Sequence, residues 1–167
     1  MITLKHVLVA TDFSQPSESA LDYGRAFART FNARLHVGHV VENVFTRIAP
    51  GDYGIANVDA IMQSLEQAAR KQLDAIVGED DRRELQAKTA LLTSNSAALG
   101  IVEYAKDAHI DLIVMGTHGR GALSKLLMGS VAERVVRTAP CPVLTVHHPE
   151  HEFLAPDALQ VVTRSRG

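Results

Sequence analysis

This sequence has no tryptophan, only one cysteine and no large excess of either charge. Its single cysteine, Cys141, excludes an internal disulfide framework and favours a reducing compartment, the cytoplasm. The formal net charge of -2 and the scattered basic residues offer no basic surface for DNA or RNA. No apolar run approaches the roughly 18 residues that span a bilayer, so we expect no membrane insertion. The apolar run near the N-terminus is followed by no A-x-A cleavage site, and we interpret it as a buried strand and not a signal peptide.

The composition is that of one globular domain. The chain has 167 residues, 46% of them hydrophobic and 22% charged. Apolar residues at helical spacing predict helices after residue 14, over 58–76, after residue 96 and over about 130–139. The charged run EDDRRE at 79–84 is expected to be a solvated connection. The expected strands are the apolar runs at 4–10, 35–41, 85–92, 111–115 and 141–146. The expected apolar helix faces include Tyr23, Ile61, Leu65, Leu99 and Val136.

Alternation of strands and helices predicts the fold. Helices between successive strands force parallel pairing with right-handed crossovers. We therefore expect an open, five-stranded α/β sheet of the Rossmann-like type, with helices on both faces. Ligands of such sheets bind at the carboxyl ends of the strands, where the strand order reverses. Thr11 and Asp12 follow the first strand and a glycine-rich stretch follows the fourth, so both are expected at one crevice.

A proline in the last expected strand suggests how copies of the chain associate. Pro142 has no N–H for a sheet ladder, which places the strand at 141–146 at an edge of the sheet. An apolar edge strand invites a partner, and symmetric pairing across a two-fold axis covers it. We therefore expect a homodimer through this strand.

The glycine-rich stretch is MGTHGRGALSKLLMGSVAERV, residues 115–135. It matches neither a Walker A loop nor a complete G-x-G-x-x-G fingerprint. Gly116 and Gly119 nevertheless let backbone amides approach an anion, and Arg120 adds positive charge. Gly129 precedes Ser130 at an expected helix N-terminus, where free N–H groups favour phosphate. The alternative is that Ser130 and Glu133 form a capping box, which needs no ligand.

Three separated motifs carry a family resemblance. Gly116-x-x-Gly119, nine residues, then Gly129-Ser130 resembles the G-2x-G-9x-G-[S/T] signature of ATP-binding universal stress proteins. The stretch ATDFSQPSESAL resembles the opening of that family, and APCPVLTV resembles its last strand. The resemblance covers residues 2–147 and implies an adenine-nucleotide α-hydrolase-like fold over 1–147, a separate tail at 148–167, and a dimer through the last strand.

The resemblance also implies roles for individual residues. Phosphates and ribose would contact the motif residues Gly116, Gly119, Gly129 and Ser130, and Val131 would offer a backbone amide. Asp12 would approach the adenine or ribose, Val40 would lie against adenine, and Met115 precedes the first glycine of the signature. His118, inside the signature, either contacts ribose or phosphate or points to solvent. Ala10 departs from the family pattern, which often has proline there.

The expected ligand is ATP, which Mg²⁺ can accompany, held by phosphate oxygens and water. No carboxylate–histidine pair is evident to activate water, so slow hydrolysis is the most that we expect. Two alternatives stay open: an interaction module of the same fold that binds no nucleotide, and a slow ATP hydrolase. A metal site is one interpretation of the histidines after the last strand, His147, His148 and His151. A solvated tail is the better interpretation, because no cysteine or fixed helical spacing supports a metal site.

Overall fold

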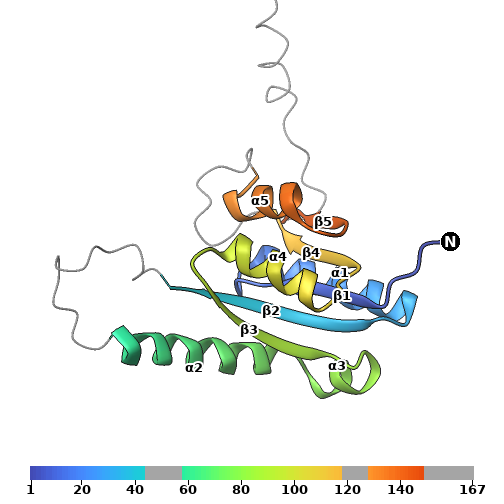
Figure 1. Ribbon diagram of the computed structural model, residues 1–167. Coiled ribbons are helices and arrows are strands. Elements are labelled where there is room, and N and C mark those ends of the chain that lie inside the picture. The colour runs from blue at the N-terminus through green and yellow to red at the C-terminus, as the bar shows by residue number, and fades with distance from the viewer. Residues whose placement is uncertain (44–57, 118–127, 149–167) are drawn as a thin grey trace, which may run out of the picture.

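The fold is a five-stranded parallel sheet between two layers of helices, as the sequence predicts. The computed structural model describes residues 1–43, 58–117 and 128–148. Its strands are paired in the order β3-β2-β1-β4-β5 (Figure 1). The strands are β1 (His6–Ala10), β2 (Arg34–Glu42), β3 (Lys88–Ser94), β4 (Leu112–Gly116) and β5 (Val143–Val146).

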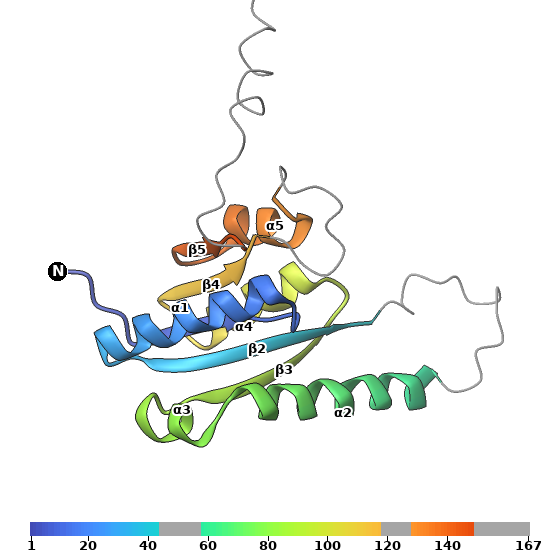
Figure 2. The same ribbon diagram turned by 180° about the vertical axis from the view of Figure 1, so that it is seen from behind.

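The helices connect these strands and cover both faces. α1 (Gln15–Phe31) joins β1 to β2, and α4 (Ala97–Asp107) joins β3 to β4. α5 (Ser130–Thr138) precedes β5. α2 (Val58–Ile76) and the short α3 (Glu79–Glu84) precede β3. Figure 2 shows α1 and Figure 1 shows α4 in front of the central strands, so these two helices lie on opposite faces of the sheet.

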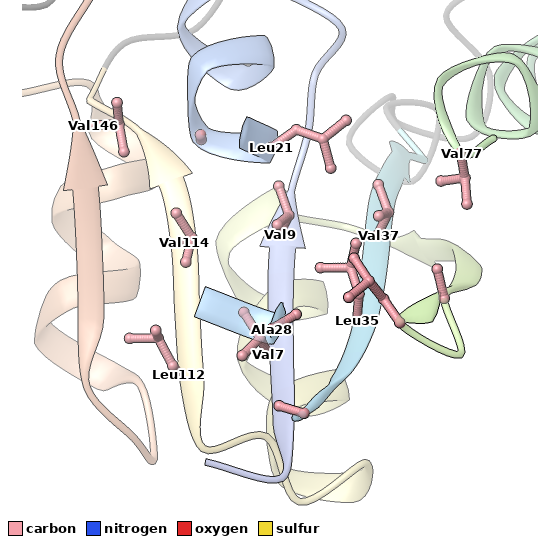
Figure 3. Close-up of a cluster of buried hydrophobic side chains, with 14 of the residues drawn as sticks. Val7, Val9, Leu21, Ala28, Leu35, Val37, Val77, Leu112, Val114 and Val146 are labelled. Carbon is pink, nitrogen blue, oxygen red and sulfur yellow. The ribbon is translucent and has the colours of Figure 1, made fainter. Parts of the chain in front are cut away.

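Alternate residues of each strand fill two separate cores, since successive side chains point to opposite faces. One core lies between the sheet and α1 and α2, and Figure 3 shows part of it. Its strand residues include Val7, Val9, Leu35, Val37 and Val114. The other core holds Leu8, Ile113 and Met115 against α4 and α5. This burial on both faces explains why β1 and β4 are continuous apolar runs.

Several expectations about element boundaries were wrong. The run at 79–84 forms α3, because Asp81 accepts hydrogen bonds from Arg25 of α1 and anchors the segment. The strand expected at 85–92 begins only at Lys88: Leu85 ends α3, with its N–H bonded to the Asp81 carbonyl. Gln86 then adopts a φ of 48° that turns the chain into β3.

The apolar faces of the helices are narrower than expected. Leu99 of α4 is 49% exposed, while Ala98, Ile101 and Ala105 are buried. The reason is that α4 approaches β2 closely at Gly100, where an added Cβ would lie 3.2 Å from the Val40 side chain. This rotates the small residues inward. Exposed residues at the borders of the other expected faces are Tyr23, Ile61, Leu65 and Val136.

The sheet reverses its strand order between β1 and β4. β1 leads to β2 on one side, and after β3 the chain returns through α4 to place β4 on the other side of β1. β5 lies at one edge of the sheet, as predicted. The strand expected at 141–146 begins only at Val143, however, and the Pro142 carbonyl faces β4, so the missing N–H of Pro142 is not what leaves the edge open. Within the residues that the structure describes, no helix is long and apolar enough to cross a membrane.

Candidate nucleotide site

A cavity of about 440 Å³ opens where the strand order reverses. The carboxyl ends of β1, β2 and β4 form its floor, and the N-terminal turns of α4 and α5 form its walls. The residues of the described part of the chain that line it are Ala10, Thr11, Asp12, Ser17, Gly38, His39, Val40, Ala97, Ile101, Met115, Gly116, Thr117, Gly129, Ser130, Val131 and Ala132.

The turn between β1 and α1, residues 11–14, is held by a compact set of hydrogen bonds. The Thr11 N–H donates to the Gly38 carbonyl of β2 over 2.9 Å, which ties the turn to the sheet. The Thr11 hydroxyl oxygen accepts from the Phe13 N–H at 3.0 Å and lies 3.0 Å from the buried Ser17 hydroxyl. Asp12 Oδ1 accepts from both the N–H and the hydroxyl of Ser14. The turn thus fixes Asp12 at the cavity wall.

The N-terminus of α5 opens on the cavity. Gly129 is its N-cap, and the Gly129 N–H donates to the Thr117 carbonyl at the end of β4 over 2.8 Å. No side-chain hydrogen bond caps this helix among the described residues. Ser130, Val131 and Ala132, whose N–H groups have no partner within an α-helix, all line the cavity. This end of the helix dipole favours a negative charge.

This arrangement excludes the capping-box alternative. Ser130 is the first residue of α5 and not its N-cap, so its hydroxyl is one position too late to cap the helix. Glu133 does not reach back to the helix start but pairs with Arg137 at 3.0 Å, one turn further on.

The N-terminus of α4, on the other wall of the cavity, is capped by a carboxylate of the protein itself. Glu42 at the end of β2 accepts a hydrogen bond from the Ala97 N–H at 2.8 Å. Its carboxylate compensates the positive end of the α4 dipole. Ser96 is the N-cap by position, as expected, but makes no side-chain cap bond. An anion in the cavity is therefore better placed at α5 than at α4.

Comparison with known proteins assigns the family. The family model described as "Universal stress protein family" matches residues 3–147. The chain belongs to the universal stress protein family. A universal stress protein of Methanocaldococcus jannaschii is 33% identical over 150 residues, which cover 89% of this chain and 85% of that protein.

Two solved members show the same fold. A universal stress family protein of Burkholderia pseudomallei has 29% identity and a TM-score of 0.67, covering 86% of this chain and 96% of its own. The universal stress protein of Archaeoglobus fulgidus in complex with dAMP has 25% identity and a TM-score of 0.58, covering 87% and 99%.

The structure brings most of the sequence-predicted site residues of this universal stress protein to one cavity. The predicted residues that line it are Thr11, Asp12, Val40, Met115, Gly116, Gly129, Ser130 and Val131. His118, Gly119 and Arg120 lie outside the described residues. The sequence also predicts a long loop at 42–56, and its residues 44–56 lie outside the described residues as well.

Gly116 at the cavity also makes room for a neighbouring helix. A Cβ added at residue 116 would lie 2.8 Å from Pro16 Cβ and 3.0 Å from the Pro16 carbonyl carbon. The missing side chain therefore makes room for the first turn of α1. The glycine sets how closely α1 packs on the end of β4, and through this the shape of the cavity floor.

The lining residues that the sequence did not predict include Ala97 and Ile101 of α4 and His39 of β2. The small apolar residues after Ser96 carried no signal of a site. The two-residue period of a strand predicts that His36 and His39 lie on opposite faces of β2 and cannot chelate one metal ion together. This prediction is confirmed, because His36 bonds to Tyr104 of α4 while the His39 ring packs on Phe13.

The histidines after β5 make contacts with the protein. The Nδ1 atom of His147 lies 3.4 Å from the Thr117 hydroxyl oxygen, and Nδ1 of His148 lies 3.1 Å from the Ser19 hydroxyl oxygen. His151, the third residue of the considered metal motif, and the tail from residue 149 lie outside the described residues.

Proposed function

We propose that this universal stress protein binds ATP, with Mg²⁺ carried by the phosphate oxygens and water, and acts in the cytoplasm as a nucleotide-dependent regulatory switch. The observation that carries the proposal is the N-terminus of α5, whose first-turn residues line the cavity and have no side-chain cap from the described part of the chain. The related protein solved in complex with dAMP supports an adenine nucleotide as the ligand class.

The two ends of the cavity differ in chemistry, which suggests how ATP lies in it. Gly129, Ser130 and Val131 offer amides, a hydroxyl and the helix dipole to the phosphates. Val40, Ile101 and Ala97 form an apolar wall suited to the adenine ring. Asp12 lies at the end of β1 and would contact ribose or adenine. The signature residues Gly116, Gly119 and Arg120, with His118 and Met115, complete the proposed site.

The test is isothermal titration of Mg-ATP into nucleotide-stripped protein. The Gly129→Val substitution puts a branched side chain at the N-cap of α5, where the phosphates are expected. Gly78→Val is the matched control, because Gly78 is the N-cap of α3, also extended, with no atom within 4 Å of an added Cβ. We expect binding in the wild type and in Gly78→Val and loss of binding in Gly129→Val. Equal affinity in all three proteins would rule out the α5 N-terminus as the phosphate site.

The Mg-ATP titration and the Asp12→Ala variant distinguish two other functions. A folded protein that gives no heat with Mg-ATP would be an interaction module of this fold. A slow ATP hydrolase would release phosphate at a rate abolished by Asp12→Ala, while that variant still binds ATP. Efficient hydrolysis needs a positioned base and a metal ligand besides a phosphate site, and Asp12 is the only carboxylate among the described lining residues, so we favour binding without efficient turnover.

We further propose a homodimer through β5. The Ile113 N–H donates to the Pro142 carbonyl and the Thr117 N–H to the Val146 carbonyl, so these even-numbered positions of the strand face β4. The backbone groups of Val143 and Thr145 then face the open edge, because alternate residues of a parallel strand pair on opposite sides. Sedimentation equilibrium should give a dimer for the wild type and a monomer for Thr145→Pro, which removes an outward N–H.

A further inference from the structure

The His39 side chain joins β2 to the turn at residues 11–14. Its Nδ1 atom lies 2.8 Å from the Thr11 carbonyl oxygen, and its ring packs on Phe13 with centroids 4.5 Å apart and planes at 34°. A carbonyl oxygen can only accept a hydrogen bond, so Nδ1 carries the proton. The neutral ring is therefore held as the Nδ1–H tautomer.

This hydrogen bond acts on the peptide unit that enters Asp12. The Thr11 carbonyl and the Asp12 N–H belong to one planar trans peptide, in which the two groups point in opposite directions. By holding the carbonyl, His39 also fixes the direction of the Asp12 N–H. The ring contact acts one residue later, on Phe13, whose φ of 63° lies in the left-handed region that an aromatic residue seldom adopts.

We propose that His39 is a positioning residue for the nucleotide site: its Nδ1–H and its ring hold the turn at residues 11–14 in the conformation that presents Asp12 to the cavity. The nucleotide part of this inference rests on the proposed function, whereas the effect on the turn does not. Other bonds keep the turn attached when His39 is changed, namely the Thr11 N–H to Gly38 and the Thr11 hydroxyl to Phe13 and Ser17. Substitution of His39 should therefore reorient the peptide before Asp12 without unfolding the protein.

Two substitutions separate the hydrogen bond from the ring contact. His39→Phe keeps a ring against Phe13 and removes the donor. His39→Asn removes the ring and keeps an N–H donor at the δ position of the side chain. We expect His39→Phe to weaken Mg-ATP binding by roughly three- to tenfold, the value of one hydrogen bond, and His39→Asn to restore most of that loss. Wild-type affinity in His39→Phe, or equal loss in both variants, would overturn the role of the Nδ1–H donor.

A second measurement needs no nucleotide. Long-range ¹H–¹⁵N spectra of the ligand-free wild type should show a protonated Nδ1 and an unprotonated Nε2 for His39. The Asp12 amide resonance should move in His39→Phe and return toward its wild-type position in His39→Asn. A His39 ring protonated on Nε2 alone, or an Asp12 amide unmoved in His39→Phe, would refute the positioning role whether or not ATP binds. Wild-type protein that shows the expected spectra but binds no ATP would refute the proposed function and leave the positioning of the turn standing.

Discussion

Gly116 at the end of β4 lies against Pro16 in the first turn of α1. An added Cβ would come within 2.8 Å of Pro16 Cβ and 3.2 Å of the Pro16 carbonyl oxygen, and the backbone atoms there cannot yield by a rotamer change. We predict that Gly116→Ala destabilises the protein by about 1–3 kcal/mol, as overpacking of a close contact does. The measurement is the free energy of unfolding from urea denaturation followed by circular dichroism.

Gly78→Ala is the control for this substitution. Gly78 has a φ of -72° and no atom within 4 Å of an added Cβ. The loss of a favourable N-cap residue and the smaller entropy of the unfolded chain oppose each other, so its stability should stay within about 0.5 kcal/mol of the wild type. Equal stability of the Gly116 and Gly78 variants would show that α1 can move away from β4 at little cost.

Asp81 and Arg25 form the ion pair that anchors α3. Asp81 is 5% exposed, and the Arg25 guanidinium donates to its carboxylate at 2.8 Å and to the Ile76 carbonyl at 2.8 Å. The Asp81 carboxylate raises the pKa of Arg25. Because Asp81→Ala leaves the partly buried Arg25 cation with only the exposed Asp22 as a carboxylate partner, we predict a loss of about 2 kcal/mol, discounted for the solvent that reaches Arg25.

The neighbouring residue provides the control. Asp80 also lies in the first turn of α3, but its partner Arg83 is 69% exposed and Asp80 itself 76%. Asp80→Ala therefore loses the same interaction with the helix dipole without breaking a buried pair. It should cost less than about 1 kcal/mol in the same urea titration. If Asp80→Ala were as destabilising as Asp81→Ala, the dipole and not the ion pair would explain both losses.

The same ion pair explains why α3 could not be predicted from the sequence. EDDRRE has no apolar periodicity, and its helical state depends on Arg25, 56 residues earlier in the chain. β1 and β4 were predictable because burial on both faces leaves a signature within the strand itself. The phase of α4 was not predictable, because it depends on the fit of Gly100 against Val40 across the sheet.

The residues of the candidate site also divide into those that local motifs predict and those whose role depends on tertiary contacts. Glycines and the positions after strands pointed to Asp12, Gly116 and Gly129, because parallel strands bring their carboxyl ends to one edge. The sequence left open whether Ser130 caps α5. The bond from the Glu133 N–H to the Gly129 carbonyl decides this, because it makes Gly129 the N-cap and Ser130 the first residue of the helix. His39 was missed because its role depends on the Thr11 carbonyl, in a turn that is 28 residues earlier in the chain.

Glu42 caps α4 from outside the helix, through its bond to the Ala97 N–H. We predict that Glu42→Ala destabilises the protein by about 1 kcal/mol, the usual cost of a lost N-cap. Glu42→Gln retains an acceptor oxygen and should lose less than half as much. Glu103→Ala is the control, because Glu103 is exposed in the same helix and alanine favours helix. A loss with Glu42→Gln as large as with Glu42→Ala would assign the effect to the charge alone.

His36 is buried in the core under α4, with a relative exposure of 1%. Its Nδ1 lies 2.9 Å from the Tyr104 hydroxyl oxygen and its Nε2 lies 3.1 Å from Nδ1 of His6. Burial, assisted by the positive charges of Lys88, His6 and Arg34, lowers the pKa of His36 from 6.5 to about 4. The folded protein therefore keeps this ring neutral at pH values where the unfolded chain binds a proton.

The difference in proton binding gives a stability that depends on pH. Above pH 6.5 His36 is neutral in both the folded and the unfolded state, so it does not change how the free energy of unfolding varies with pH. As the pH falls below 6.5, His36 binds a proton in the unfolded chain but stays neutral in the folded protein. The free energy of unfolding therefore decreases until about pH 4, where the folded protein also binds the proton. At about 1.36 kcal/mol per pH unit this loss amounts to about 3 kcal/mol. Urea unfolding of the wild type and of His36→Asn at pH 7.5, 6, 5 and 4 measures it: the two curves should converge as the pH falls, because Asn does not titrate. Parallel curves would mean that His36 takes up its proton in the folded protein as readily as in the unfolded chain.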